Sequence, residues 1–124
     1  MAFFAPYNPP VNSTFAAESN PSTATIIAEL ESSNFGNNTH QRSDRIYGVN
    51  IWVGGSTAAT WWIEQATSTA LTDTTDRLTV RTASQQHSQF LKVFKLAAND
   101  RIRVRHASTV TGTFEAYLQA QELA

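Results

Sequence analysis

The sequence of 124 residues contains no cysteine, which excludes a disulfide-stapled scaffold and any metal site built on thiolates. It has no hydrophobic run that approaches the roughly 18 residues of a transmembrane helix. Its first ten residues, MAFFAPYNPP, lack the basic segment and the long apolar stretch of a signal peptide. We therefore expect a single domain that is made and folded in a cytoplasm.

Charge of either sign is scarce. The net charge is -1 and the sequence pI is near 6.3, which gives no general attraction to nucleic acid or to an anionic membrane. We expect neither as a partner. Lysine occurs only twice, whereas serine and threonine together number 27. An excess of threonine over lysine and glutamate favours strands over solvent-exposed helices.

Residues with catalytic chemistry do not gather in any recognisable arrangement. His40, His87 and His106 lie far apart, without the spacing of metal ligands. Asp73 and Asp76 flank two threonines but match no calcium-loop pattern, so an ordinary polar turn is favoured. The sequence has no nucleophile elbow and no phosphate-binding glycine loop. We expect no enzyme, no bound metal and no cofactor, because an enzyme would need ionisable groups clustered in a cleft.

Short runs with period-two alternation, many of them β-branched or aromatic, recur along most of the chain. Residues 101–106 alternate arginine with Ile102, Val104 and His106, which predicts a half-buried strand with His106 at the end of its buried face. The other expected strands are 24–30, 45–53, 57–66, 77–81, 88–96 and 113–121. Residues 90–97 and 114–121 also fit a helical stripe, but the surrounding short β runs favour strands. The pattern predicts an all-β fold, a single jelly roll or β-sandwich of about eight strands over residues 24–124.

Residues 1–23 have a different character, with four prolines that keep the segment extended and forbid a regular helix. A free tail should be polar, whereas this one is aromatic. We expect an extended N-terminal arm that lies on its own domain or docks on a neighbouring subunit. The expected contact residues of this arm are Phe3, Phe4, Tyr7, Pro9, Pro10, Val11 and Phe15.

Arg101, Arg103 and Arg105 should all point to one side of their strand, about 7 Å apart. One interpretation is a solvated outer face balanced by carboxylates such as Glu115. The other is a subunit interface, with Glu115 and Tyr117 as further candidates, where arginine forks bind carboxylates or backbone carbonyls. The three tryptophans, at positions 52, 61 and 62, are expected in the core, with an interface anchor as the alternative.

The last quarter of the chain resembles the closing strands of the tumour-necrosis-factor and complement-head superfamily. In that superfamily a leucine, a small residue and a Gly/Asn-Asp turn precede an alternating strand, and a Gly-x-Phe-x-x-x-Leu strand closes the fold. Asn99 stands where the superfamily usually has glycine, and it can adopt the same left-handed conformation. The matching residues are Leu96, Ala97, Ala98, Asn99, Asp100, Ile102, Val104, Gly112, Phe114 and Leu118.

The whole chain resembles small head-decoration or cement proteins of tailed bacteriophages, through its Pro/aromatic start, its Cys-free Thr-rich body and its ending GTFEAYLQAQEL. This resemblance implies a non-enzymatic virion protein, made in the host cytoplasm, that binds the major capsid protein on the outer capsid surface. It implies a homotrimeric jelly roll that cements the shell, because binding assembled capsid stabilises that state by mass action. The alternative is a trimeric receptor- or glycan-binding head of a viral fibre.

Overall fold

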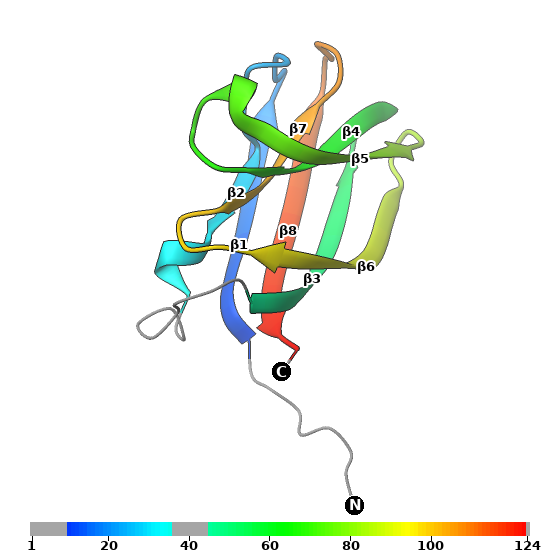
Figure 1. Ribbon diagram of the computed structural model, residues 1–124. Helices are drawn as coiled ribbons and strands as arrows, with labels where there is room; N and C mark the ends of the chain where they lie inside the picture. The colour runs from blue at the N-terminus through cyan, green and yellow to red at the C-terminus, as the bar shows by residue number, and fades with distance from the viewer. Residues whose placement is uncertain (1–9, 36–44, 124) are drawn as a thin grey trace, which may run out of the picture.

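The computed structural model describes residues 10–35 and 45–123, which form two four-stranded antiparallel sheets packed face to face (Figure 1). The first sheet, called sheet A, has the strand order β1-β8-β3-β6, and sheet B has the order β2-β7-β4-β5. The strands of sheet A are β1 (Pro10–Ser19), β8 (Thr113–Glu122), β3 (Arg45–Gly55) and β6 (His87–Leu96). Those of sheet B are β2 (Ala28–Glu31), β7 (Arg101–His106), β4 (Ala59–Ala66) and β5 (Thr74–Thr82).

The connections between these strands define a jelly roll. Only β4 and β5 are joined within one sheet, and every other consecutive pair of strands lies in opposite sheets. The two sheets therefore interleave along the chain, as in an eight-stranded double Greek key. The predicted fold class, an all-β jelly roll of about eight strands, is confirmed.

The core lies between the sheets and is built from the alternate residues that the sequence pattern indicates. On β8, Phe114, Ala116, Leu118 and Ala120 are all fully buried and point inward. The same holds for every second residue of β3 from Tyr47 to Val53. Each large apolar side chain buried in this way contributes roughly 1.5–3 kcal/mol relative to an exposed one. The helical interpretations of residues 90–97 and 114–121 do not apply, because both segments are strands.

The first described strand differs from the expectation. The sequence pattern predicts residues 10–19 in an arm outside the sandwich, whereas they form the edge strand β1 and pair with β8 from Pro10 to Ser19. The free edge of β8 explains this pairing, since its backbone groups need partners and β1 supplies them. Val11 and Ala16 pack against the core. The expected strand 24–30 starts only at Ala28, because residues 22–25 form a turn closed by a hydrogen bond from the Thr25 amide to the Ser22 carbonyl.

Within residues 10–35 and 45–123, two single turns of 3-10 helix interrupt the strands, η1 (Ser32–Asn34) and η3 (Leu71–Asp73). Within the described ranges, no helix has the length and hydrophobicity needed to cross a bilayer. The turn before β7 follows the resemblance noted in the sequence. Asn99 has a φ of 73°, the left-handed conformation expected there, and the Asp100 carboxylate accepts a hydrogen bond from the Ala97 amide at 2.9 Å.

Candidate interaction surfaces

The arginine side chains of β7 lie on the outer face of sheet B, where they converge on one carboxylate. Glu64 of β4 is fully buried, and its Oε1 accepts hydrogen bonds from Nε of both Arg103 and Arg105 at 2.9 Å. Its Oε2 accepts from Nε of Arg77 at 2.8 Å. Burial by itself raises the pKa of Glu64, but the hydrogen bonds from these three arginines outweigh it, so the pKa lies below its ordinary value of 4.5.

Arg103 uses its remaining donors to hold the segment that joins β4 to β5. Its Nη1 donates to the backbone carbonyls of Ser68 and Ala70 at 3.3 Å, and its Nη2 donates to Oγ1 of Thr74 at 2.6 Å. Arg105 donates to the carbonyl of Thr23 at 2.5 Å. The guanidinium groups therefore bind carboxylates and carbonyls, as predicted for an interface, but all of these partners belong to the same chain.

This geometry corrects the two roles expected for the arginine stripe. Arg103 and Arg105 are 0% and 6% exposed, so they form neither a solvated face nor a free subunit interface. Arg101 is paired with Glu29 and Glu31, both at 3.1 Å. Glu115 cannot balance the stripe because it lies on β8, in the other sheet.

The three tryptophans have three different environments. Trp61 is fully buried, as expected, and its indole Nε1 donates to Oγ1 of Thr82 at 2.8 Å. Trp62 is half-buried on the outer face of sheet B, with the guanidinium carbons of Arg77 and Arg105 at 3.7 and 4.8 Å from its ring centroid. Trp52 is half-buried on the outer face of sheet A, where it stacks on His87 with ring centroids 4.3 Å apart.

The outer face of sheet A carries few charges, and exposed apolar side chains lie on it among amide- and hydroxyl-bearing residues. All of the large hydrophobic residues that are exposed in the described part of the chain lie on this face, on or beside its strands: Phe15, Ile46, Leu91, Val93 and Leu123. Leu91 and Leu123 flank Gly48, where an added Cβ would come within 3.4 Å and 3.3 Å of their side chains. Glu115 and Lys95 lie at opposite ends, and the facing positions between them in the described strands are uncharged.

An aromatic row crosses this same face. Phe15 of β1 is opposite Tyr117 of β8, which is opposite Trp52 of β3. The Phe15 and Trp52 rings lie 6.4 Å apart, and the Tyr117 hydroxyl accepts a hydrogen bond from Nε2 of Gln119 at 3.1 Å. The row is thus continuous across three strands and is bordered by amide side chains.

The structure brings some of the sequence-predicted contact residues together on this face and not others. Phe15, Glu115 and Tyr117 lie side by side on β1 and β8, whereas Val11 is half-buried against the core and Pro10 is exposed at the start of β1. The predicted contacts at Phe3, Phe4, Tyr7 and Pro9 lie outside the described residues. Sequence reasoning missed Leu91 and Val93. Their signal was the run of residues 88–96, which is hydrophobic on both faces of the strand.

The described residues offer little basis for metal or acid–base chemistry. No group of three or more histidines, cysteines or carboxylates within 10–35 and 45–123 could hold a metal ion. His106 ends the buried face of β7, as predicted, with its ring edge-on to Trp61 at 4.2 Å and to Phe114 at 4.4 Å. It is fully buried and neither ring nitrogen has a hydrogen-bond partner. Burial lowers the pKa of His106 to about 4.

Comparisons with family models and with curated proteins found no match. Several solved structures share the fold. The CBM22-1 xylan-binding domain of Paenibacillus barcinonensis Xyn10C is similar over 97% of this chain and 98% of its own, with a TM-score of 0.58 and 8% identity. The globular domain of zebrafish complement 1qA protein is similar over 90% and 96%, with a TM-score of 0.50 and 8% identity. The BiXyn10A CBM1 structure matches over 64% of this chain and 53% of its own, with a TM-score of 0.45 and 12% identity. At these identities the comparisons show the fold alone, a jelly-roll β-sandwich.

Proposed function

We propose that this protein is a non-enzymatic structural module that assembles as a homotrimer and decorates a viral capsid, cementing the shell from its outer surface. The observation that carries the proposal is the concentration of exposed hydrophobic side chains on the outer face of sheet A. Several large exposed hydrophobic side chains on one face are uncommon for a monomer, and an exposed apolar patch with a polar rim is typical of an interaction site.

The two faces of the sandwich support this division of roles. The arginines of the outer face of sheet B that were expected at an interface are satisfied within the chain by Glu64, Glu29 and Glu31. Sheet A instead presents Trp52, Tyr117 and Phe15, and tryptophan and tyrosine are the side chains that dominate the energetics of protein interfaces. The face that we assign to assembly is therefore sheet A, not the arginine stripe.

The mechanism of cementing follows from mass action. A protein that binds assembled shell but not its separated subunits lowers the free energy of the assembled state. Three linked copies raise the effective concentration of each further contact, so weak individual contacts give tight retention. No catalytic step is involved. The partner in this proposal is the major capsid protein, and the location is the outer surface of the virion.

Replacing Leu91 and Val93 by aspartate tests the proposal. Both side chains are more than half exposed, at 59% and 54%, so the double variant should keep its stability within about 0.5 kcal/mol while placing two charges in the apolar face. We expect light scattering to report a trimer for the unmodified chain and a monomer for Leu91→Asp/Val93→Asp. Co-sedimentation with shells that lack the protein should be lost in parallel.

The matched control is Thr72→Asp, an exposed position in η3, beside the start of β5. It adds a charge without touching sheet A, and it should leave both mass and co-sedimentation unchanged. An unmodified chain that is monomeric and ignores shells would contradict the proposal, as would assembly that tolerates both aspartates on β6.

Glycan binding is the second candidate, and the aromatic row favours it. Phe15, Tyr117 and Trp52 are bordered by Asn50, Gln89 and Gln119 in the same or adjacent register rows, a combination of rings and amides that can contact the faces and hydroxyls of sugars. The similar CBM22-1 domain is described as xylan-binding. Retention of the chain on soluble xylan in affinity electrophoresis, lost in Trp52→Ala, would support this candidate against the first.

A further inference from the structure

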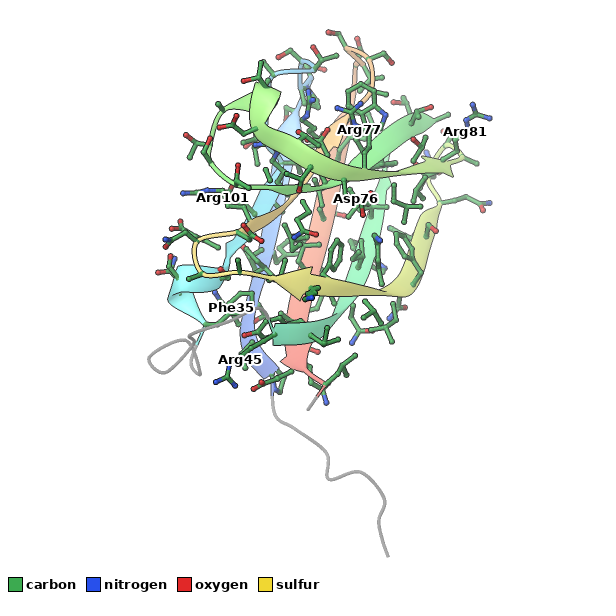
Figure 2. All side chains as sticks on the ribbon, viewed as in Figure 1. Phe35, Arg45, Asp76, Arg77, Arg81 and Arg101 are labelled. Carbon is green, nitrogen blue, oxygen red and sulfur yellow. The ribbon has the colours of Figure 1, made fainter. Side chains whose placement is uncertain are left out.

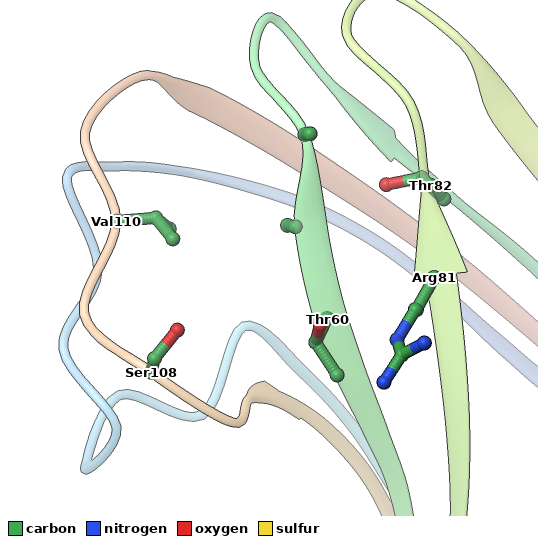
Figure 3. Close-up of a pocket in the computed structure, with 7 residues that line it drawn as sticks. Thr60, Arg81, Thr82, Ser108 and Val110 are labelled. Carbon is green, nitrogen blue, oxygen red and sulfur yellow. The ribbon is translucent and has the colours of Figure 1, made fainter.

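A pocket lies at one end of sheet B, away from the apolar face (Figure 3). It is formed by the start of β4, the end of β5 and the loop that follows β7. Its volume is about 250 Å³, which is smaller than the roughly 300–1,000 Å³ of sites for drug-sized ligands and suits a single side chain. The residues that line it are Ala58, Ala59, Thr60, Arg81, Thr82, Ser108 and Val110.

Arg81 distinguishes this pocket from the rest of sheet B. It is exposed, and among the arginines of the described residues it is the one without a carboxylate partner. The other five are paired: Arg45 with Glu122, Arg101 with Glu29 and Glu31, and Arg77, Arg103 and Arg105 with Glu64. A guanidinium has five donors in a fixed fork that matches a carboxylate. Each of the other described arginines has a carboxylate partner within the chain, whereas the guanidinium of Arg81 has none in the described ranges.

The other polar groups of the pocket suit the same ligand. Thr60 is the cross-strand partner of Arg81, so its hydroxyl lies on the same face of the sheet (Figure 3). Ser108 faces Thr60 across the pocket (Figure 3). Thr82, the next residue on β5, lies on the inner face of the sheet, where its hydroxyl accepts a hydrogen bond from Trp61. One cation with nearby hydroxyl donors matches an anion that carries two acceptor oxygens.

The electrostatic surroundings reinforce this match. Arg77 precedes Arg81 by four residues on the same strand face, and with Arg103 and Arg105 it shares a single carboxylate, so three cations there meet one anion. Figure 2 shows the Arg77 and Arg81 side chains at separate points along β5, since four residues of a strand span about 13 Å. The excess positive charge favours an approaching negative group.

We propose that this pocket receives the carboxylate of a glutamate or aspartate side chain from a protein partner. The lining has no aromatic ring on which a sugar could stack, so an acidic sugar is disfavoured. The identification of the partner as the shell protein rests on the proposed function. The recognition of a carboxylate by this pocket does not depend on it. The pocket and the apolar face belong to different sheets, so the two proposals can fail separately.

The test is a titration of the whole isotope-labelled chain with propionate, which mimics a glutamate side chain, followed by the backbone amide signals of Thr60, Arg81 and Ser108. Propionate should give saturable shifts at constant ionic strength, and neutral propionamide should not. Arg81→Gln should weaken propionate binding at least about tenfold, because it removes a charge-assisted bidentate contact. Lys95→Gln, which removes an exposed cation from the outer face of sheet A, is the matched control and should retain binding.

Shifts that do not saturate, that chloride reproduces, or that persist in Arg81→Gln would overturn the proposal. Glucuronate binding tighter than propionate would overturn the side-chain assignment in favour of an acidic sugar. Leu91→Asp/Val93→Asp should still bind propionate, and Arg81→Gln should still form trimers but lose co-sedimentation with shells. If the unmodified chain bound propionate but Arg81→Gln still bound shells as strongly, the pocket would bind carboxylates and the shell protein would not be its partner.

Discussion

Glu64→Gln is expected to lower the free energy of unfolding by about 3–5 kcal/mol at neutral pH, the cost of removing one member of a buried ion pair. Glu64, Arg103 and Arg105 are all buried, and the two carboxylate oxygens accept charged hydrogen bonds from both sides. The amide keeps the shape of the side chain but removes its negative charge. Two guanidinium groups then remain in the sheet without a counter-ion, and that desolvation cost is no longer offset.

Urea unfolding followed by tryptophan fluorescence measures this loss. The matched control is Glu122→Gln, which removes the partner of Arg45 from a pair whose side chains are 21% and 33% exposed. A pair this close to solvent contributes about 0–1 kcal/mol, so the control should unfold near the unmodified protein. Equal losses in the two variants would show that the convergence of three arginines on Glu64 has no special weight.

The Glu64 cluster marks where sequence reasoning reaches its limit. The alternation of residues 101–106 predicts correctly that the arginines share one face of β7 and that Ile102 and Val104 share the other. It cannot indicate that Glu64, 39 residues from Arg103, lies directly opposite. That contact depends on which strands become neighbours and in which register, and both are decided by packing of the whole sandwich. The alternating arginines are therefore predicted from the sequence to face solvent or another subunit, whereas in the structure they pair with carboxylates of the same chain.

The two edge strands of sheet A give the complementary lesson. Residues 10–19 were assigned to an arm because prolines precede them, and their role as β1 depends on the free edge of β8, which no local pattern reveals. In β6, Phe90 and Phe94 alternate with Leu91 and Val93, so both faces look apolar in the sequence. Only the paired register shows that Leu91 and Val93 face outward, beside Asn50 and Gly48. The candidate interaction face thus arises from the pairing of β3, β6 and β8, whose strand character the sequence did predict, with β1, which it assigned to an arm.

His106 is expected to make the protein lose about 3 kcal/mol of stability as the pH falls from about 6.5 to about 4. Its imidazole is enclosed by Trp61 and Phe114, and neither ring nitrogen has a hydrogen-bond partner, so the folded state holds it neutral. The unfolded chain binds the proton near pH 6.5, whereas the folded chain binds it only near pH 4. The stabilising contribution of the neutral ring is therefore complete above the upper pKa and is lost on acidification through this window.

The position of this window separates His106 from the Glu64 cluster. The pKa of Glu64 is lowered, so its contribution is complete above 4.5 and is lost as the pH falls below that value, whereas most of the range in which His106 acts lies above it. His106→Leu should change stability at neutral pH by less than about 1.5 kcal/mol, because leucine fills a similar volume without unpaired nitrogens. It should also flatten the pH dependence of urea unfolding between about pH 6.5 and about pH 4. His87→Gln, which alters an exposed histidine on sheet A, should keep the slope of the unmodified chain. If His106→Leu kept that slope as well, the acid sensitivity would have to come from other groups, and the enclosed imidazole would have no part in it.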